Sequence, residues 1–470
     1  MRLLNRKDKL ATENMLFSAT DLRKLIVPLF LQQVLNVLVG TVDSLMVASA
    51  GEAAVSGVSL VGTLDTLLVI FFTSLVAGGS VVLSQTLGRK NHEAACEAAK
   101  QILYIVTALS VILTVIVLTF RGPLLNLLFG DVEADVMASA SGYFFFVALS
   151  FPLLAINYSV GACFNAAGKT RISLTNSIII NMINVAGNAI FIFGFKLGAV
   201  GAALATLFAR FAGTVIMLIK IHNKDHAIHI EKIFRYKPDF SVIGKVVRIG
   251  VPNGIESAMF QFGRLLTQSL ISTMGTSVIA GNAVALTVCG YQYMTGTACS
   301  SAMITVVGRS IGAGESKQAK HYSRVILAIN YIAIWTVILF TVIMMRPIIS
   351  AYNLSAESGD ITRTLILYHC AFAAVIWPIG FMLPSSFRAV GDVRFSLVVS
   401  MATMWIFRVA GSYVLALDSI SVFGLFSIPG FGMGIMGVWV AMTVDWVFRS
   451  TLFFIHYLRL YGRLDTLKKL

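Results

Sequence analysis

Charge is what this sequence lacks most. Only 12% of its 470 residues are Asp, Glu, Lys or Arg, whereas 57% are hydrophobic, and the mean hydropathy is +0.84. Soluble domains carry about 25% charged residues, so this composition excludes an ordinary soluble protein. Motifs of soluble chemistry are missing too, because the chain has no G-x-x-x-x-G-K-[ST] phosphate loop and no H-E-x-x-H zinc pair. Its five cysteines lack the spacing of a disulfide framework.

Long apolar runs are what the sequence has instead. Each is long enough to cross the roughly 30 Å hydrocarbon core of a bilayer as a helix. The twelve runs cover residues 24–48, 54–80, 98–120, 138–164, 173–195, 198–221, 244–272, 278–304, 322–345, 361–387, 395–418 and 434–458. We therefore predict an all-α membrane protein with twelve transmembrane helices. No cofactor is expected.

The second half of the chain repeats the first. Pro28 recurs as Pro252, and the segment FNAAGKTRIS at 164–173 returns as FRAVGDVRFS at 387–396. A repeat of this length indicates two duplicated halves of six helices each. Since each half has an even number of spans, the halves run in parallel. We predict an N-terminal lobe over residues 1–221, a cytoplasmic linker over 222–243 and a C-terminal lobe over 244–470.

The distribution of positive charge predicts the orientation. Lys and Arg number 36 against 22 Asp and Glu, which gives a formal net charge of +14. Most of them precede the first run, follow the last or lie in alternate connections. By the positive-inside rule these segments and both termini are cytoplasmic. Topology thus explains the basic excess without a nucleic-acid partner, and we expect a monomer in the lipid bilayer of the inner (plasma) membrane.

Four acidic residues lie inside predicted spans: Asp43, Asp65, Glu256 and Asp445. A charged side chain there costs at least about 2.5 to 3.5 kcal/mol unless it is paired, neutralised or hydrated. Asp43 shares a polar helix face with Gln32 and Asn36, which precede it by three turns and two turns of helix. We interpret Asp65 and Asp445 as packing or vestibule residues.

A second polar stripe lies on the fifth predicted helix, where Asn184 and Asn188 are one turn apart. With Thr206 on the sixth helix, they lie at a depth in the membrane similar to that of Asp43. Carboxylate, amide and hydroxyl oxygens suit Na⁺, and the same carboxylate could instead take up a proton. The alternative is a polar cluster that only holds helices together.

Several segments carry a resemblance to a known family. The run VLVGTVDSLMVASAGEAAVSGVSL at 37–60, the FNAAGKTR turn, INVAGNAIFIFG at 183–194 and GAVGAALAT at 198–206 resemble the multidrug and toxic compound extrusion (MATE) transporters. The resemblance implies two six-helix bundles that rock about a central cavity. It also implies antiport, with export of drugs or organic metabolites, usually cationic, in exchange for H⁺ or Na⁺.

The resemblance also implies roles for individual residues. Asp43 matches the cation-binding acid of the first helix, Asn184 and Asn188 the polar pair of the fifth, Thr206 the hydroxyl of the sixth, and Asn157 the amide of the fourth. Many members have an aspartate where Asn188 stands, so this site has one formal negative charge and favours H⁺. A branch with acids on the seventh and tenth helices is not matched, because the tenth span has none.

The substrate cavity is expected between the lobes. The candidate residues are polar or aromatic: Gln32, Asn36, Glu256, Arg264, Tyr291, Tyr293 and Trp377. Glu256 either pairs with Arg264 or lines the cytoplasmic mouth. The alternatives to small-molecule export are a lipid-linked oligosaccharide flippase of the same superfamily and a membrane-embedded enzyme.

Overall fold

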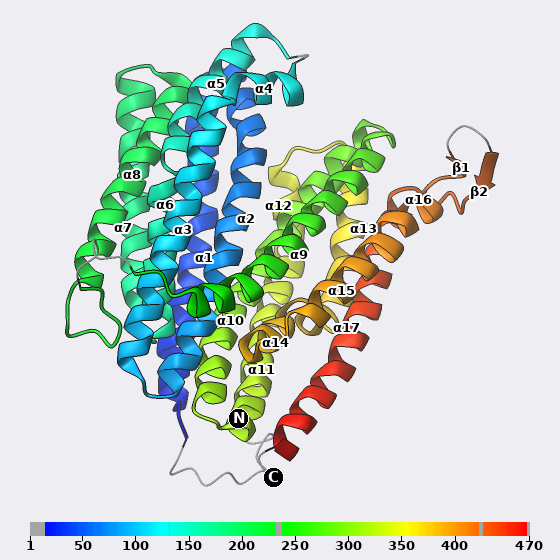
Figure 1. Ribbon diagram of the computed structural model, residues 1–470. Coiled ribbons are helices and arrows are strands. Elements are labelled where there is room, and N and C mark those ends of the chain that lie inside the picture. The colour runs from blue at the N-terminus through cyan, green and yellow to red at the C-terminus, as the bar shows by residue number, and fades with distance from the viewer. Residues whose placement is uncertain (1–14, 131, 232–236, 423–425, 468–470) are drawn as a thin grey trace.

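The computed structural model describes residues 15–130, 132–231, 237–422 and 426–467, and they are almost entirely helical (Figure 1). The first half contains α1 (Ala19–Ala48), α2 (Glu52–Gly88), α3 (His92–Thr119), α4 (Arg121–Phe129), α5 (Ala134–Leu149), α6 (Phe151–Ala166), α7 (Thr170–Asn188), the π-helical turn η2 (Ala189–Gly194) and α8 (Gly198–Ile221). The second half contains α9 (Phe240–Ser272), α10 (Thr276–Gly312), α11 (Ser316–Ile343), α12 (Met345–Ala351), α13 (Ala356–Ala373), η3 (Pro378–Met382), α14 (Pro384–Val390), α15 (Arg394–Thr403), η4 (Met404–Ala410), α16 (Gly411–Ala416) and α17 (Gly434–Leu467).

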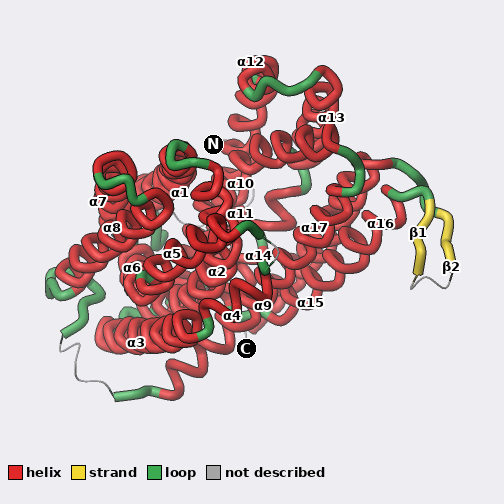
Figure 2. Tube along the Cα trace, turned by 90° about the horizontal axis from the view of Figure 1, so that it is seen from above, coloured by secondary structure: helices red, strands yellow, loops and turns green. Residues whose placement is uncertain are grey.

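A small hairpin interrupts the helical pattern. Strands β1 (Ser419–Val422) and β2 (Phe426–Pro429) pair antiparallel, with Ser419 opposite Pro429. The hairpin projects from the side of the molecule between the last two spans (Figures 1 and 2). The first strand, SISV, alternates polar and apolar residues, which is typical of short strands. The prediction of an all-α membrane fold is confirmed apart from this hairpin, which we did not expect.

Each predicted span has a helix or a broken helix in the structure. Eight helices are long and apolar enough to cross a bilayer, and two bent pairs, α5 with α6 and α13 with η3 and α14, meet the same test together. Their bends of 43° and 68° coincide with Pro152 and Pro378, because proline cannot donate the backbone hydrogen bond of a straight helix. The remaining two predicted spans are α9 and α10, helices of 33 and 37 residues. They are not among the helices that meet this test, so their crossing of the membrane, and with it the total of twelve spans, stays a prediction.

The halves form two bundles that meet along α2, α9 and α10. Viewed from above, α1, α3 and α5 to α8 lie on one side, α13 and α15 to α17 on the other, and α2 and α10 near the middle (Figure 2). α8 ends at Ile221 and α9 begins at Phe240. The predicted linker 222–243 therefore extends into the first turn of α9. Residues 232–236 lie outside the described part, and the lobe boundaries stay predictions.

Glycines allow the bundles to approach closely at one end. A Cβ on Gly78 of α2 would lie 2.6 Å from the carbonyl oxygen of Val246 and 2.7 Å from the backbone nitrogen of Gly250 on α9. Further along α2, Gly88 is equally crowded by the backbone of Arg309 on α10. Small residues at crossing points are how membrane helices pack backbone to backbone. The lobes are thus closed against each other at the end of the molecule where α1 begins.

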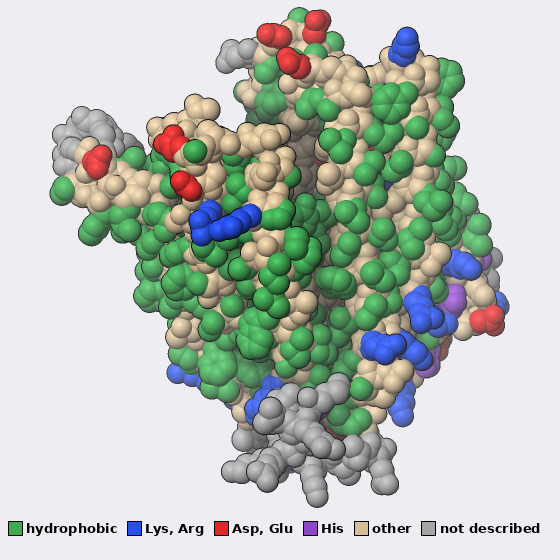
Figure 3. All heavy atoms as spheres, turned by 180° about the vertical axis from the view of Figure 1, so that it is seen from behind, with side chains coloured by type: hydrophobic (Ala, Val, Ile, Leu, Met, Phe, Trp, Pro, Cys, Tyr) green, Lys and Arg blue, Asp and Glu red, His purple; other side chains and the backbone are tan. Residues whose placement is uncertain are grey.

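At the opposite end the bundles separate. Figure 3 shows a groove between them that deepens toward the end where α1 finishes. Hydrophobic side chains cover the middle of this face, most of the visible Asp and Glu lie toward the open end, and most Lys and Arg lie toward the closed end. The start of α1 and the end of α17 are at the same, closed end (Figure 1). This arrangement agrees with an even number of spans.

Candidate functional site

The structure brings four of the predicted ion-site residues together near the open end of the N-terminal bundle. Asp43 comes from α1, Asn184 and Asn188 from α7, and Thr206 from α8. Asn188 Nδ2 donates to Asp43 Oδ1 at 2.7 Å and approaches Asn184 Oδ1 at 3.4 Å. Asn184 Nδ2 donates to the Thr206 hydroxyl at 3.2 Å. Three helices therefore converge on one carboxylate.

The neighbours of Asn184 favour the orientation in which its amide oxygen and nitrogen are exchanged. The nitrogen then donates to both Asp43 oxygens, at 2.7 and 3.1 Å, and the oxygen accepts from the Thr206 hydroxyl at 3.2 Å. This orientation suits an ionised carboxylate, which only accepts hydrogen bonds. Asn184 and Asn188 then both donate to the Asp43 carboxylate.

An unused acceptor completes the cluster. Asn188 is 1% exposed and its Oδ1 has no hydrogen-bond partner. Leaving a buried acceptor unsatisfied costs about 1 to 3 kcal/mol. In the described part of the chain, no Lys, Arg or His forms a salt bridge with the Asp43 carboxylate. One unpaired carboxylate, an unsatisfied amide oxygen, a second amide and a hydroxyl are a set of oxygens that can hold a small cation.

Asn157 is not part of this cluster. Its side chain on α6 accepts from Asn176 Nδ2 at 2.9 Å and donates to the Thr214 hydroxyl at 3.5 Å. It therefore links α6, α7 and α8 within the bundle. Asp65 is also elsewhere, since its carboxylate lies 3.8 Å from the guanidinium of Arg210.

Glu256 repeats in the second half a contact that Gln32 makes in the first. Gln32 Nε2 donates to the Ser177 hydroxyl at 2.9 Å, and the Ser400 hydroxyl donates to Glu256 Oε1 at 2.7 Å. The two pairs occupy equivalent positions in the internal repeat. Glu256 thus bonds to serine and does not form the suggested pair with Arg264.

The predicted aromatic cavity residues are dispersed. Tyr293 stacks on Trp377 with ring centroids 5.0 Å apart and its hydroxyl lies 2.8 Å from His369 Nε2. Trp377 is only 7% exposed, so this pair belongs to the core of the C-terminal bundle. Tyr291 lines an apolar pocket of about 460 Å³ between α1, α10, α11 and α12. Asn36 is exposed on α1.

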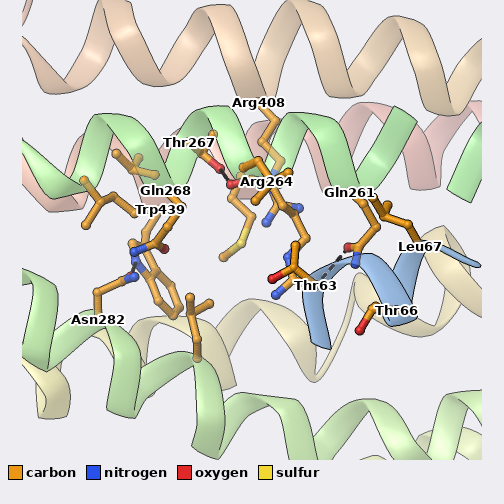
Figure 4. A pocket seen from close by; sticks show the side chains of 15 residues that line it. Thr63, Thr66, Leu67, Gln261, Arg264, Thr267, Gln268, Asn282, Arg408 and Trp439 are labelled. Carbon is orange, nitrogen blue, oxygen red and sulfur yellow. Dashed lines mark hydrogen bonds between the residues drawn. The ribbon is translucent and has the colours of Figure 1, made fainter. Parts of the chain in front are cut away.

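A polar cavity of about 290 Å³ lies between the bundles (Figure 4). Its walls come from α2, α9, α10, η4 and α17, and Arg264 is the one predicted cavity residue among them. The polar and aromatic residues that the sequence analysis missed here are Thr63, Thr66, Gln261, Thr267, Gln268, Asn282, Arg408 and Trp439. Arg408 could have been found, because it is an arginine inside a predicted span.

The walls of this cavity are basic. Arg264 Nη1 donates to Gln261 Oε1 at 3.3 Å, and the Arg408 guanidinium lies 5.3 Å from the ring centroid of Phe260. Among the described residues, neither arginine is within salt-bridge distance of a carboxylate, and no Asp or Glu lines the cavity. Asp445 lies nearby in sequence on α17 but pairs with Arg449 at 3.0 Å.

One hydrolase-like pattern has a structural explanation. Residues 308–312 read G-R-S-I-G, which matches G-x-S-x-G. A nucleophile elbow places this serine on a turn between a strand and a helix. Here the segment lies within α10, and the Ser310 hydroxyl donates to the Val306 carbonyl at 2.8 Å. The pattern therefore serves the packing of α10 against α2.

Comparisons with known proteins agree with the repeat and the fold. A family model described as MatE matches residues 28–190 and again 252–414. An uncharacterized transporter YisQ of Bacillus subtilis is 25% identical over 433 residues, covering 89% of this chain and 90% of the relative. A probable multidrug resistance protein NorM of Thermotoga maritima is 24% identical, covering 92% and 90%. The crystal structure of a MATE protein in the bent conformation superposes with a TM-score of 0.86 at 17% identity, covering 96% and 97%.

Proposed function

Because the chain belongs to the MatE family of transporters, we propose that it is a cation-coupled antiporter that exports small organic molecules by alternating access. The observation that carries this proposal is the unpaired Asp43 carboxylate, held by Asn184 and Asn188 at the open end of one bundle. The relatives are transporters, so catalysis is not part of the proposal. No contact among the described residues favours a lipid-linked oligosaccharide flippase.

The closed and open ends support alternating access. Glycine contacts join the bundles where α1 begins, and the groove opens where α1 ends. With the basic end in the cytoplasm, the described state opens to the outside. We propose that the lobes, residues 1–221 and 244–470, rock about this contact as a monomer in the plasma membrane. Each closure exposes the groove to the other side.

The coupling step uses the chemistry of the Asp43 cluster. In the outward state the Asp43 carboxylate takes up the cation. A single carboxylate is neutralised by one proton, whereas Na⁺ also needs several neutral oxygens to replace its water. The cluster offers few such oxygens and one negative charge, so we propose H⁺ as the coupling ion and Na⁺ as the weaker alternative. Taking up one cation removes the negative charge of Asp43 from the groove.

Reconstituted transport tests this function. Full-length protein in proteoliposomes should move a fluorescent organic substrate against its gradient when a proton gradient of the physiological direction is imposed. Asp43→Asn keeps the shape of the side chain but cannot take up the ion, so it should abolish gradient-driven transport. Asp135→Asn removes an exposed carboxylate outside the cluster and should leave transport unchanged. Wild-type transport by the Asp43 variant would remove the basis of the proposal.

A further inference from the structure

The internal repeat relates the Asp43 cluster to the basic cavity. The two family matches cover residues 28–190 and 252–414, and an offset of 224 relates Pro28 to Pro252 on the first helix of each half and Val185-Ala186-Gly187 to Val409-Ala410-Gly411 on the fifth. In this register Thr267 occupies the position of Asp43, and Arg408 occupies the position of Asn184. Both Thr267 and Arg408 line the cavity between the bundles. The cavity is therefore the counterpart, in the second half, of the ion cluster in the first.

The duplicated positions differ in charge. The first half has a carboxylate where the second has a hydroxyl, and it has a neutral amide where the second has a guanidinium. A further arginine, Arg264, lies on the cavity wall where the first half has Gly40. A site that evolved from the same ancestral half thus carries two positive charges in place of one negative charge.

The side-chain nitrogen of Asn282, in the wall of the same cavity, is a hydrogen-bond donor without a partner. Asn282 is 1% exposed, and its Oδ1 accepts from Trp439 Nε1 at 3.0 Å. Since indole nitrogen only donates, this bond fixes the orientation of the amide. Asn282 Nδ2 is then left buried without an acceptor. Among the residues that the structure describes, no carboxylate lines this cavity. The buried Asn282 nitrogen and the two guanidinium groups therefore have no negatively charged hydrogen-bond acceptor in its wall.

The apolar residues of the cavity wall indicate the kind of ligand that would fit. Trp439, Leu265, Leu286 and Val438 provide apolar surface beside the donors. Figure 4 shows Arg264 and Arg408 at one part of the cavity and Trp439 with Asn282 at another. An oxyanion bound by the arginines would leave an aromatic or aliphatic body against the tryptophan. The resemblance implied cationic substrates, but this wall offers a cation no negative partner.

We propose that this cavity is a substrate site for organic anions, in which Arg264 and Arg408 bind a carboxylate, sulfonate or phosphate group and Trp439 contacts an apolar body. This inference names the substrate class of the proposed exporter and rests on that function. Arginine is suited to the task because its planar fork donates two parallel hydrogen bonds to an oxyanion. The coupling cation and the substrate anion then occupy equivalent positions in different halves.

Three probes with one naphthalene body test the charge preference. Full-length protein in lipid nanodiscs at pH 7.5 would be dialysed against 1-naphthoate, the neutral 1-naphthamide and the cation 1-naphthylmethylammonium. We expect 1-naphthoate to bind at least tenfold more tightly than the amide, which corresponds to about 1.4 kcal/mol. The cation should bind most weakly. Equal binding of the three probes, or tightest binding of the cation, would overturn the proposal.

Variants assign the preference to the cavity. Arg408→Gln and Arg264→Gln should each weaken 1-naphthoate binding about tenfold and leave 1-naphthamide binding unchanged, which also shows that the variant is folded. Arg363→Gln removes an exposed arginine of the same bundle outside the cavity and should change neither. Thr267→Asp restores the charge of the first half and should shift the preference toward 1-naphthylmethylammonium. An anion preference that survives both arginine substitutions would place the site elsewhere.

Different results would refute the anion site and the proposed export function. Binding to nanodiscs needs no ion gradient, so Asp43→Asn should retain the preference for 1-naphthoate while losing gradient-driven transport. Proton-driven export by a protein without the anion preference would refute only the substrate class. An anion preference in a protein that responds to no ion gradient would refute only the coupled export.

Discussion

Replacing Asn188 by aspartate should convert the ion site toward Na⁺. Asn188 Nδ2 is 2.7 Å from Asp43 Oδ1, so Asn188→Asp puts a second carboxylate beside the first. Two unit charges about 4 Å apart repel by about 4 kcal/mol at an effective dielectric constant of about 20. Asp43 is only half-buried, so we take half of this repulsion, roughly 2 kcal/mol. A bound Na⁺ relieves it, and Na⁺ affinity should rise about thirtyfold.

Two measurements check this expectation. In proteoliposomes without a pH gradient, an inward Na⁺ gradient should drive export by the variant more strongly than by the wild type. The thermal midpoint of the purified variant should also rise with Na⁺, because ligand at one hundred times its Kd stabilises a protein by about 2.7 kcal/mol.

A matched control separates the site from a general effect of charge. Asn157→Asp adds the same charge to the same bundle, but Asn157 bonds to Asn176 and Thr214 outside the cluster. It should give no Na⁺ response. If Asn188→Asp is folded and shows no change in Na⁺ stimulation or stability, or if the control responds equally, the interpretation of the Asp43 cluster as the ion site is wrong.

Three further predictions concern topology and packing. Cysteine at Glu357 should react with an impermeant maleimide added outside intact cells, and cysteine at Asp225 should not; the reverse labelling would invert the orientation. Gly78→Ala should lower the free energy of unfolding by about 1 to 3 kcal/mol, seen as a lower thermal midpoint, because its Cβ would overlap the backbone of α9; an unchanged midpoint would mean that the bundles do not meet there. Arg449→Leu should destabilise the protein by about 3 to 5 kcal/mol because it leaves Asp445, which is 0% exposed, without its partner; the double variant with Asp445→Leu should recover most of the midpoint, and no recovery would contradict this account.

The sequence alone predicted the Asp43 cluster because the pattern that indicates it is local and lies along single helices. A spacing of one helical turn put Asn184 and Asn188 on one face of a helix, and the apolar runs gave the depth of each residue in the membrane. Residues of like depth on neighbouring helices then met, as Asp43 and Asn188 did. The duplicated halves were equally visible, since a repeat is a property of the chain itself.

The depth of a residue in the membrane does not show how its helix is rotated or which distant helix it faces. Only the tertiary structure determines these two features. Asn157 has suitable chemistry but turns toward Asn176, and Trp377 is turned into the core by the bent helix around Pro378. The basic cavity takes its walls from five elements far apart in the chain. The repeat relates both Arg408 and Arg264 to positions near the Asp43 cluster, but it does not show that the two arginines line one cavity. Their meeting is fixed by packing of whole helices against one another, because each crossing depends on side chains from both partners.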